Sequence, residues 1–412
     1  MKHLEDISIH PKEYPLARRE ESIIDNYHGT KVADPYRWLE DPHAKETQDF
    51  IQKLNDISSP YFQGCEMRET IKEKLTQIFN YEKYGCTGKY GKFYYYNYNS
   101  GLQNQSVIYQ QTHFSEEGKV FLDPNTFSPD GSISISQRSW SNDGNILAYG
   151  LSEKGNDTIT IKFIKNTGEK LLDTIYGVKY GNLAWCDDNS GIFYSAYPHS
   201  KNKSNKFTVE EDSYHSLYYH KMGTNTEEDI LVAYFPDNLK AYITASVTED
   251  GSLLMVSISD GCSSRNALYY YNLKQKNNKI DGKLDLMPIF SKFDACYEYI
   301  DHEDNIALFQ TNHNAPMFKL IRLDLTSIYN DQNNYELIRL DLTSIYNDQN
   351  NYEVIIPEDA NRTLSFVVPV ANNKLLISYL EVVLTTLYVY DRASFEMLYK
   401  IPLEIGSMIV SA

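Results

Sequence analysis

The sequence of 412 residues has no run of 18 or more apolar residues, although 42% of its residues are hydrophobic. The apolar stretch Leu375–Tyr390 is interrupted by Ser378, Glu381 and two threonines. A helix that crosses a membrane is therefore not expected, and no membrane partner is predicted. The first residues, Met1–Asp6, lack the apolar core of a secretory signal peptide, which favours a cytoplasmic protein.

Cysteine and positive charge are also scarce. The five cysteines lie far apart and form no C-x-x-C pair, so neither a disulfide framework nor a zinc site is expected. A reducing cytoplasm is the simplest interpretation. Acidic side chains outnumber basic ones by 56 to 39, which gives a net charge of -17. Nucleic acid is therefore excluded as a partner, because binding phosphate needs the opposite sign.

Catalytic and cofactor motifs are absent as well. There is no G-x-S-x-G nucleophile elbow, and its nearest match, Gly150–Gly155, has the wrong spacing. Walker A, G-x-G-x-x-G and H-E-x-x-H are missing, so no cofactor, metal or catalytic residue is predicted. His215 and His220 lie five residues apart and should point to opposite faces of a strand, which argues against a shared metal. We interpret both as surface histidines on a loop.

Tyrosine is the abundant residue, with 35 copies in a sequence that is 13% aromatic, and this favours strands. The first 80 residues differ from the rest. Asp41–Pro42 is typical of a helix start, and apolar residues then recur at helical spacing. We predict a short helical segment over residues 1–80, unable to bury its own apolar faces, and a mainly β region over residues 81–412. The residues at helical spacing are Phe50, Ile51, Leu54 and Ile57, then Ile71, Leu75, Ile78 and Phe79.

A pattern repeats within the β region at intervals of about 50 residues, the period of propeller blades. Each copy has an aromatic or apolar strand, then a turn rich in Asp, Asn or Gly, then a strongly apolar strand, as in Trp140–Tyr149. The sequence thus predicts a β-propeller of the seven-bladed type with about six blades present and a seventh beginning at Ile405–Val410. The expected blades lie near residues 85–125, 130–170, 178–225, 240–275, 288–355 and 362–402.

One stretch of 17 residues occurs twice without a change, first as Leu320–Glu336 and again as Leu337–Glu353. A perfect copy shorter than a blade is no architectural unit. The strands Leu320–Leu325 and Leu337–Leu342 compete for one position in the fifth blade. We expect one copy in the blade and the other extruded as a loop or an extra edge strand.

Several motifs resemble the prolyl oligopeptidase family. They are Asp25–Gly29, Val32–Pro42, Phe193–Pro198 and Asp260–Cys262, and the resemblance extends over nearly the whole chain. It implies a helical N-terminal segment and a propeller, with the Ser, Asp and His of the catalytic triad in a C-terminal α/β-hydrolase domain that is missing from this chain. The complete protein would cleave short peptides after proline, and the propeller would restrict substrate size. The chain alone is expected to be inactive, with its own hydrolase domain and proline-containing peptides as partners.

The resemblance also implies a substrate-binding set on the propeller, namely Tyr180, Tyr242 and Cys262. Cys262 is the residue type usual in the family, whereas Tyr180 and Tyr242 replace Phe and Met. Ser259 stands where an Arg often contacts the peptide. Ordinary blade packing for the tyrosines, and an inert buried thiol for Cys262, remain open as alternatives.

The polar segment His199–Ser216 either borders substrate entry, as the resemblance implies, or is a solvated loop between strands. Two other interpretations of the whole chain also stay open. One is a non-catalytic propeller that binds peptides or proteins. The other is an incomplete gene product, which the unchanged repeat favours.

Overall fold

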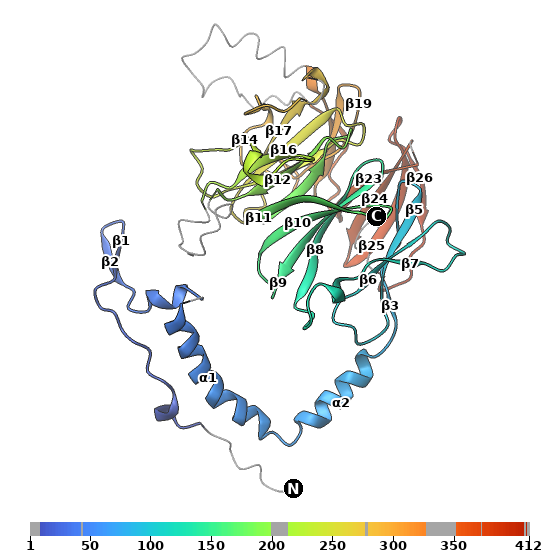
Figure 1. Ribbon diagram of the computed structural model, residues 1–412. Coiled ribbons are helices and arrows are strands. Elements are labelled where there is room, and N and C mark those ends of the chain that lie inside the picture. Colours follow the sequence, from blue (N-terminus) through green and yellow to red (C-terminus); the bar gives the residue numbers. More distant parts are fainter. Residues whose placement is uncertain are drawn as a thin grey trace. The chain divides into compact units, whose positions relative to one another are not determined.

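A computed structural model describes residues 9–42, 44–198, 213–276, 279–326, 352–371, 373–407 and 409 (Figure 1). Contacts divide the chain into two compact units, the first formed mainly by residues up to Ile135 and the second mainly by those after it. In the part of the chain that is described, no helix is long and apolar enough to cross a membrane.

The N-terminal region contains a β-hairpin and two helices. The hairpin pairs β1 (Ile24–Tyr27) with β2 (Thr30–Ala33), and the helices are α1 (Lys45–Gln63) and α2 (Arg68–Phe79). The predicted helix start at Asp41–Pro42 is three residues too early. The Asp41 carboxylate accepts a hydrogen bond from the N–H of Ala44 at 3.1 Å, so it closes a turn just before α1 and does not cap the helix itself. Short 3-10 turns lie at Pro11–Glu13 and Arg37–Glu40.

Both helices leave apolar side chains in solvent, as the sequence predicts. Thr47 is the only buried residue of α1, and α2 has none. Ile71 is 51% exposed and Ile78 is 64% exposed on α2. The Trp38 and Phe50 rings pack edge to face at 5.8 Å, which ties the start of α1 to the preceding turn.

The described residues after α2 fold into six antiparallel meanders, which are the six predicted blades (Figure 1). Apolar and polar residues alternate along the strands, so apolar side chains gather on the buried faces. Turns that contain Asp, Asn and Gly join the strands. Blade one holds β3 (Lys83–Tyr84), β4 (Gly88–Tyr90), β5 (Phe93–Asn99), β6 (Val107–Gln111) and β7 (Lys119–Leu122). Blade two holds β8 (Ile133–Trp140), β9 (Ile146–Glu153), β10 (Thr158–Lys165) and the first part of β11 (Lys170–Trp185).

Blade three begins with the second part of β11, so blades two and three form one seven-stranded sheet. It continues through β12 (Gly191–Ala196), β13 (Ser216–Lys221) and β14 (Ile230–Ala233). Blade four holds β15 (Ala241–Val247), β16 (Leu253–Asp260), β17 (Asn266–Asn272) and β18 (Met287–Phe290). Blade five holds β19 (Tyr297–Glu303), β20 (Ile306–Thr311), β21 (Lys319–Asp324) and β22 (Tyr352–Ile356). Blade six holds β23 (Arg362–Val370), β24 (Lys374–Glu381), β25 (Leu384–Asp391) and β26 (Met397–Ile401).

One boundary between the predicted blades is wrong. β18 closes blade four, whereas we expected blade four to end near 275 and blade five to begin at 288. β18 (Met287–Phe290) is short and is separated from β17 by a long connection in the sequence. The spacing of the repeated pattern therefore assigns this strand to blade five, although it pairs with β17 of blade four. The expected start of a seventh blade, Ile405–Val410, falls partly outside the described residues, and its described part contains no strand.

Side-chain amides connect neighbouring blades of the second unit. The Asn182 amide donates to the carbonyl of Ala245 and accepts from the N–H of the same residue, which joins β11 to β15. Asn266 makes the equivalent pair of bonds to Tyr297 of β19, at 2.9 and 2.7 Å. Each amide satisfies a backbone donor and acceptor that neither sheet can pair, so the blades are held in fixed register.

The predicted turns with Asp, Asn and Gly connect the first two strands of blades two to four, and the turns of blades two and three form hydrogen bonds with each other. Asn189 donates to the Asp143 carboxylate at 2.7 Å, and Asn142 donates to Asp187 at 3.2 Å. Arg392 of blade six forms an ion pair with Asp301 of blade five at 2.8 Å. These turns therefore define one end of the blades, which we call the turn end.

The tandem repeat contributes to blade five from both copies. β21 takes its strand from the first copy, which confirms that one copy occupies the blade, and β22 begins with Tyr352 and Glu353 from the end of the second copy. Leu337–Leu342, the competing strand, lies outside the described residues.

Deleting residues 337–353 should leave every described strand residue of blade five in place. Tyr335 and Glu336 would then stand directly before Val354, and they are identical to Tyr352 and Glu353. Because the connection between β21 and β22 becomes 17 residues shorter, we expect the free energy of unfolding to rise by up to about 1 kcal/mol. Urea denaturation of both forms measures this. A loss of stability would mean that the second copy makes contacts that blade five needs.

Candidate functional site

Tyr242 and Cys262 lie at the end of blade four opposite the turn end. β15 and β16 pair antiparallel, with Tyr242 opposite Ser259 and Ala241 opposite Asp260. Cys262 follows β16 by two residues, in a turn closed by a hydrogen bond of 3.0 Å from the Gly261 N–H to the Lys240 carbonyl. The strand ends thus bring Tyr242, Ser259 and Cys262 to one edge of the blade.

Tyr180 lies where β11 passes from blade two to blade three. The pairing of β11 with β12 shifts register between Val178 and Leu183, so Tyr180 sits in an irregular stretch of the strand. Its φ of +55° is left-handed, which is strained for a bulky residue. Its hydroxyl donates to Asp157 at 2.8 Å, and the Lys179 ammonium lies 5.0 Å from its ring. Because the side chain is 48% exposed, the ring presents a face to solvent.

A buried histidine, His215, contacts the ring of Tyr242 and the backbone next to Tyr180. His215, which directly precedes β13, is 1% exposed. Its ring lies parallel to Tyr242 at 5.2 Å between centroids and 1° between planes. Nε2 lies 3.0 Å from the carbonyl of Lys179, next to Tyr180, and Nδ1 accepts the N–H of Ile243, next to Tyr242, at 3.0 Å. Burial raises the pKa of the Tyr242 hydroxyl.

The interpretation of His215 and His220 as surface histidines is wrong, since both are buried. Both have partners distant in sequence, which the spacing of five residues cannot reveal. The expectation of opposite faces agrees with their contacts, because His215 bonds Lys179 and Ile243 whereas His220 contacts Asp173 and Asp229. The sequence signal that could have suggested His215 is its position directly before a strand and among the tyrosines Tyr214, Tyr218 and Tyr219.

Cys262 is exposed, so the alternative of an inert buried thiol is wrong for this residue. Cys186 shows the contrast, because it is fully buried and burial raises its pKa to about 12. No described residue forms a disulfide with either. Cys262 is therefore a free thiol accessible at the same edge as Tyr242, while Cys186 belongs to the core.

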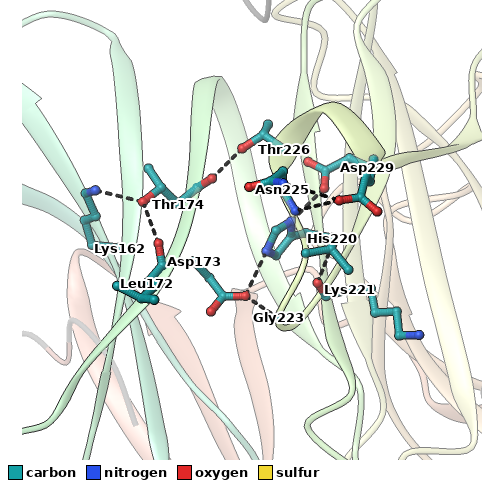
Figure 2. A network of polar contacts seen from close by, with 12 residues as sticks. Lys162, Leu172, Asp173, Thr174, His220, Lys221, Gly223, Asn225, Thr226 and Asp229 are labelled. Carbon is teal, nitrogen blue, oxygen red and sulfur yellow. Dashed lines mark hydrogen bonds and ion pairs between the residues drawn. The ribbon is translucent and has the colours of Figure 1, made fainter.

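A second polar group, which we call the His220 cluster, consists of Asp173, His220 and Asp229 (Figure 2) together with Tyr194. The Nδ1 atom of His220 lies 2.6 Å from Asp229 Oδ1, and its Nε2 lies 3.5 Å from Asp173 Oδ1. Tyr194 donates its hydroxyl proton to Asp229 Oδ2 at 2.5 Å, and burial together with Asp229 raises the pKa of that hydroxyl.

The His220 cluster fastens the segment after β13 to β11. Asp173 accepts the N–H of Gly223, and Thr226 donates its hydroxyl to the carbonyl of Thr174 (Figure 2). The His220 ring also stacks on Phe163 of β10 at 6.0 Å. Because the His220 and Asp229 side chains are both 0% exposed, the cluster is a structural lock inside the blades and cannot contact a substrate.

The turn end carries a pocket of about 420 Å³. Next to it, Ser252 Oγ lies 3.1 Å from Nε2 of His302. This pair is no catalytic triad. The Ser252 hydroxyl donates to Asp250 at 2.8 Å, and Nδ1 of His302 contacts the hydroxyl of Tyr299 where a triad has a carboxylate. The pocket is lined by Glu249, Asp250, Asp301, His302, Pro369, Val370, Ala371 and Arg392.

Within the described ranges, no group of three or more His, Cys, Asp or Glu residues is arranged to hold a metal. What the site offers is binding chemistry: a tyrosine ring, Tyr242, stacked on a buried histidine, a second tyrosine, Tyr180, that is half exposed, and a free thiol at the same edge as Tyr242. Proline-containing segments dock on such aromatic surfaces, since the proline ring packs flat on an aromatic face.

Residues 15–412 match a protein family described as "Prolyl oligopeptidase, N-terminal beta-propeller domain". A prolyl endopeptidase of Elizabethkingia meningoseptica is 34% identical over 310 residues, which cover 75% of this chain and 42% of that protein. Prolyl oligopeptidase A of Amanita bisporigera is 29% identical over 431 residues, which cover 98% of this chain and 54% of that protein. The chain spans about half the length of the curated relatives it matches.

A solved structure shares this fold. Prolyl oligopeptidase B of Galerina marginata, bound to a 35mer hydrolysis and macrocyclization substrate, superposes with a TM-score of 0.77 at 25% identity. The match covers 95% of this chain and 54% of that one. The likeness confirms the predicted propeller with a short helical N-terminal segment.

Proposed function

The chain belongs to the prolyl oligopeptidase family, and from this premise we propose that it supplies the N-terminal and propeller part of a serine endopeptidase that cleaves short peptides after proline. The observation that carries the proposal is the unbroken family match over residues 15–412. The relatives named above are prolyl endopeptidases and prolyl oligopeptidases. The propeller would contact the peptide and limit its size, while a hydrolase domain would supply the nucleophile.

In this proposal the substrate side of the propeller is the edge that carries Tyr180, Tyr242 and Cys262. Support comes from the exposure of Tyr180 and Cys262 and from the stacking of Tyr242 on His215. Aromatic rings held in fixed positions suit proline, which has no backbone N–H and is recognised by its ring. The turn end is the less suitable side, because half of the residues that line its pocket are charged.

The proposed protein partner is the chain's own hydrolase domain, which would cover the N-terminal helices. On α2, Ile71, Leu75 and Ile78 are each about half exposed or more. Apolar side chains at helical spacing that remain in solvent mark a surface for another protein element. The proposal also includes a reducing, cytoplasmic compartment, which is supported by five cysteines that are all free thiols.

The proposal is tested on the endogenous protein, captured with an antibody against the N-terminal segment. We expect an intact mass well above 47.7 kDa and hydrolysis of a reporter peptide after proline, blocked by a serine-directed inhibitor. The purified 412-residue chain serves as the control and should show no turnover above a blank, because its sequence has no nucleophile elbow.

Two results would contradict this expectation. An endogenous mass of 47.7 kDa without hydrolysis would favour the alternative, a non-catalytic propeller that binds peptides or proteins. Hydrolysis by the purified 412-residue chain would mean that a nucleophile lies outside the known elbow motif.

A further inference from the structure

The pocket at the turn end lies where blades four, five and six meet. Arg392 of blade six donates to the carbonyl of His302 at 3.1 Å and forms an ion pair with Asp301 at 2.8 Å, so it holds blade six to blade five. The His302 ring lies 3.1 Å from the Ser252 hydroxyl and thereby contacts blade four. Because these contacts fix the walls, the cavity of about 420 Å³ needs no rearrangement to accept a ligand.

The lining of this pocket carries more negative than positive charge. Of its three carboxylates, Asp301 is paired with Arg392. Asp250 lies 3.7 Å from the ammonium of Lys274, a residue whose side chain is 58% exposed. Glu249 is exposed and forms no ion pair with the described residues. Glu249 is therefore the carboxylate that is free to bind a cation, with Asp250 next to it.

Two pKa shifts agree with a negative potential in the pocket. Burial alone would raise the pKa of Asp250, but hydrogen bonds from neighbouring hydroxyls and a backbone N–H outweigh burial and lower it, so this carboxylate stays ionised. Burial raises the pKa of the Tyr299 hydroxyl, which lies 2.7 Å from His302, and the carboxylates of Asp301 and Asp250 raise it further. The nearby guanidinium offsets only part of this effect.

The negative charge extends over the neighbouring turns of the same end. Four successive turns that join the first two strands of a blade contain eight Asp and Glu residues and no Lys or Arg. The hydrogen bonds that Asn142 and Asn189 donate to these turns come from neutral amides, so they leave the carboxylate charges uncancelled. A field of one sign attracts and retains an ion of the opposite sign. The four turns are residues 141–145, 186–190, 248–252 and 301–305.

The other wall of the pocket is apolar and is formed by Pro369, Val370 and Ala371. A carboxylate wall facing an apolar wall suits a ligand with a charged head and an aliphatic stem. None of the lining residues is Phe, Tyr or Trp, so the pocket lacks the aromatic cage that binds quaternary ammonium groups. In the described ranges no group of three or more His, Cys, Asp or Glu is arranged to hold a metal. A head group that donates hydrogen bonds to carboxylates is therefore favoured.

We propose that the turn-end pocket is a second ligand site, which binds a primary ammonium or guanidinium group carried on an aliphatic stem. The head group contacts Glu249 and Asp250, and the stem packs on Pro369–Ala371. A free diamine and a basic side chain of a peptide share this chemistry. The inference goes beyond the proposed function, because the pocket lies at the end of the blades opposite Tyr242 and Cys262.

The test is isothermal titration calorimetry of the purified 412-residue chain with three probes. Cadaverine represents a free diamine, Nα-acetyl-lysine methylamide represents a side chain within a peptide, and 1-pentanol has a similar stem without a charge. We expect at least one of the two cations to bind with a dissociation constant on the order of 1 mM. Binding should weaken as salt is added, since part of the attraction is electrostatic. The alcohol should show no binding.

Glu249→Gln removes the unpaired charge and keeps the size of the side chain. We expect it to weaken binding of the cation about fivefold. The matched control is Glu303→Gln, because Glu303 is exposed in the acidic turn 301–305 but does not line the pocket. The control makes the same change in net charge and should keep the affinity within about twofold of the wild type.

The two cations distinguish the sources of the ligand. Binding of cadaverine alone supports the site and assigns it to a free diamine, whereas binding of the lysine derivative supports the site and assigns it to a basic side chain of a partner. Three results would overturn the inference: no binding of either cation, binding of 1-pentanol as tight as that of cadaverine, or an equal loss of affinity in Glu249→Gln and Glu303→Gln. The last result would mean that the cation senses the general charge of the turn end and does not enter the pocket.

Discussion

Replacing Asp229 with asparagine should lower the free energy of unfolding by about 3–5 kcal/mol, because it replaces a buried carboxylate that makes two hydrogen bonds, each of which contributes about 1.5–3 kcal/mol when one partner is charged. Asp229 accepts from Tyr194 at 2.5 Å and lies 2.6 Å from His220, and its side chain is 0% exposed. An amide at this position turns one of its two acceptors into a donor. The new N–H then faces either the His220 imidazole or the Tyr194 hydroxyl, and the group that it faces loses the acceptor that the carboxylate provides.

Chemical denaturation of the 412-residue chain measures this effect, with Glu227→Gln as the control. Glu227 is exposed and lies in the same turn, η5 (Thr226–Glu228), so it carries the same charge change without the buried contacts. The control should remain within about 0.5 kcal/mol of the wild type. Equal losses in the two variants would mean that the charge of the region matters and the His220 cluster does not.

Replacing Phe163 with alanine should cost a similar amount, about 3–5 kcal/mol, through the cavity that it leaves in blade two. Phe163 of β10 is fully buried. Its ring meets Trp185 edge to face at 5.7 Å and lies nearly parallel to His220 at 6.0 Å. The change therefore removes apolar contacts and also the ring that covers the imidazole of the His220 cluster.

Phe163→Leu is the matched control, since it keeps most of the volume and none of the ring stacking. We expect it to lose less than half as much stability as Phe163→Ala in the same denaturation assay. If the two variants are equally destabilised, the ring contacts with Trp185 and His220 matter more than the cavity. A negligible effect of Phe163→Ala would contradict the packing of this core.

The blades could be predicted because their information is local. Each turn such as Ser141–Gly144 or Thr248–Gly251 combines a side chain that caps its own backbone with a glycine in the left-handed region. A strongly apolar strand then follows within a few residues. The helices were predicted for the same reason, from spacing within one segment, although the Asx turn at Asp41 displaced the expected start of α1.

The candidate site could be predicted only in part. The resemblance supplied Tyr180, Tyr242 and Cys262, but no sequence pattern indicated the histidine between the tyrosines. The two hydrogen bonds of His215 join residues that are 36 and 28 positions away from it. The His220 cluster likewise depends on Asp173 of blade two, which approaches His220 only after blades two and three are packed, whereas Asp229 lies in the same blade as His220. Side chains that act between strands have no periodicity from which to infer their partners.

The tandem repeat has a consequence for the energy landscape of blade five. Two identical strands can satisfy the same hydrogen bonds to β20, so the sequence encodes two nearly degenerate registers. The residue before each copy differs, since Lys319 precedes the first copy and Glu336 precedes the second. The Lys319 ammonium lies 3.3 Å from the hydroxyl of Tyr352 and 5.3 Å from its ring centroid, and a glutamate cannot make the second of these contacts, which is a cation–π interaction. The lysine thus favours the first register over the second.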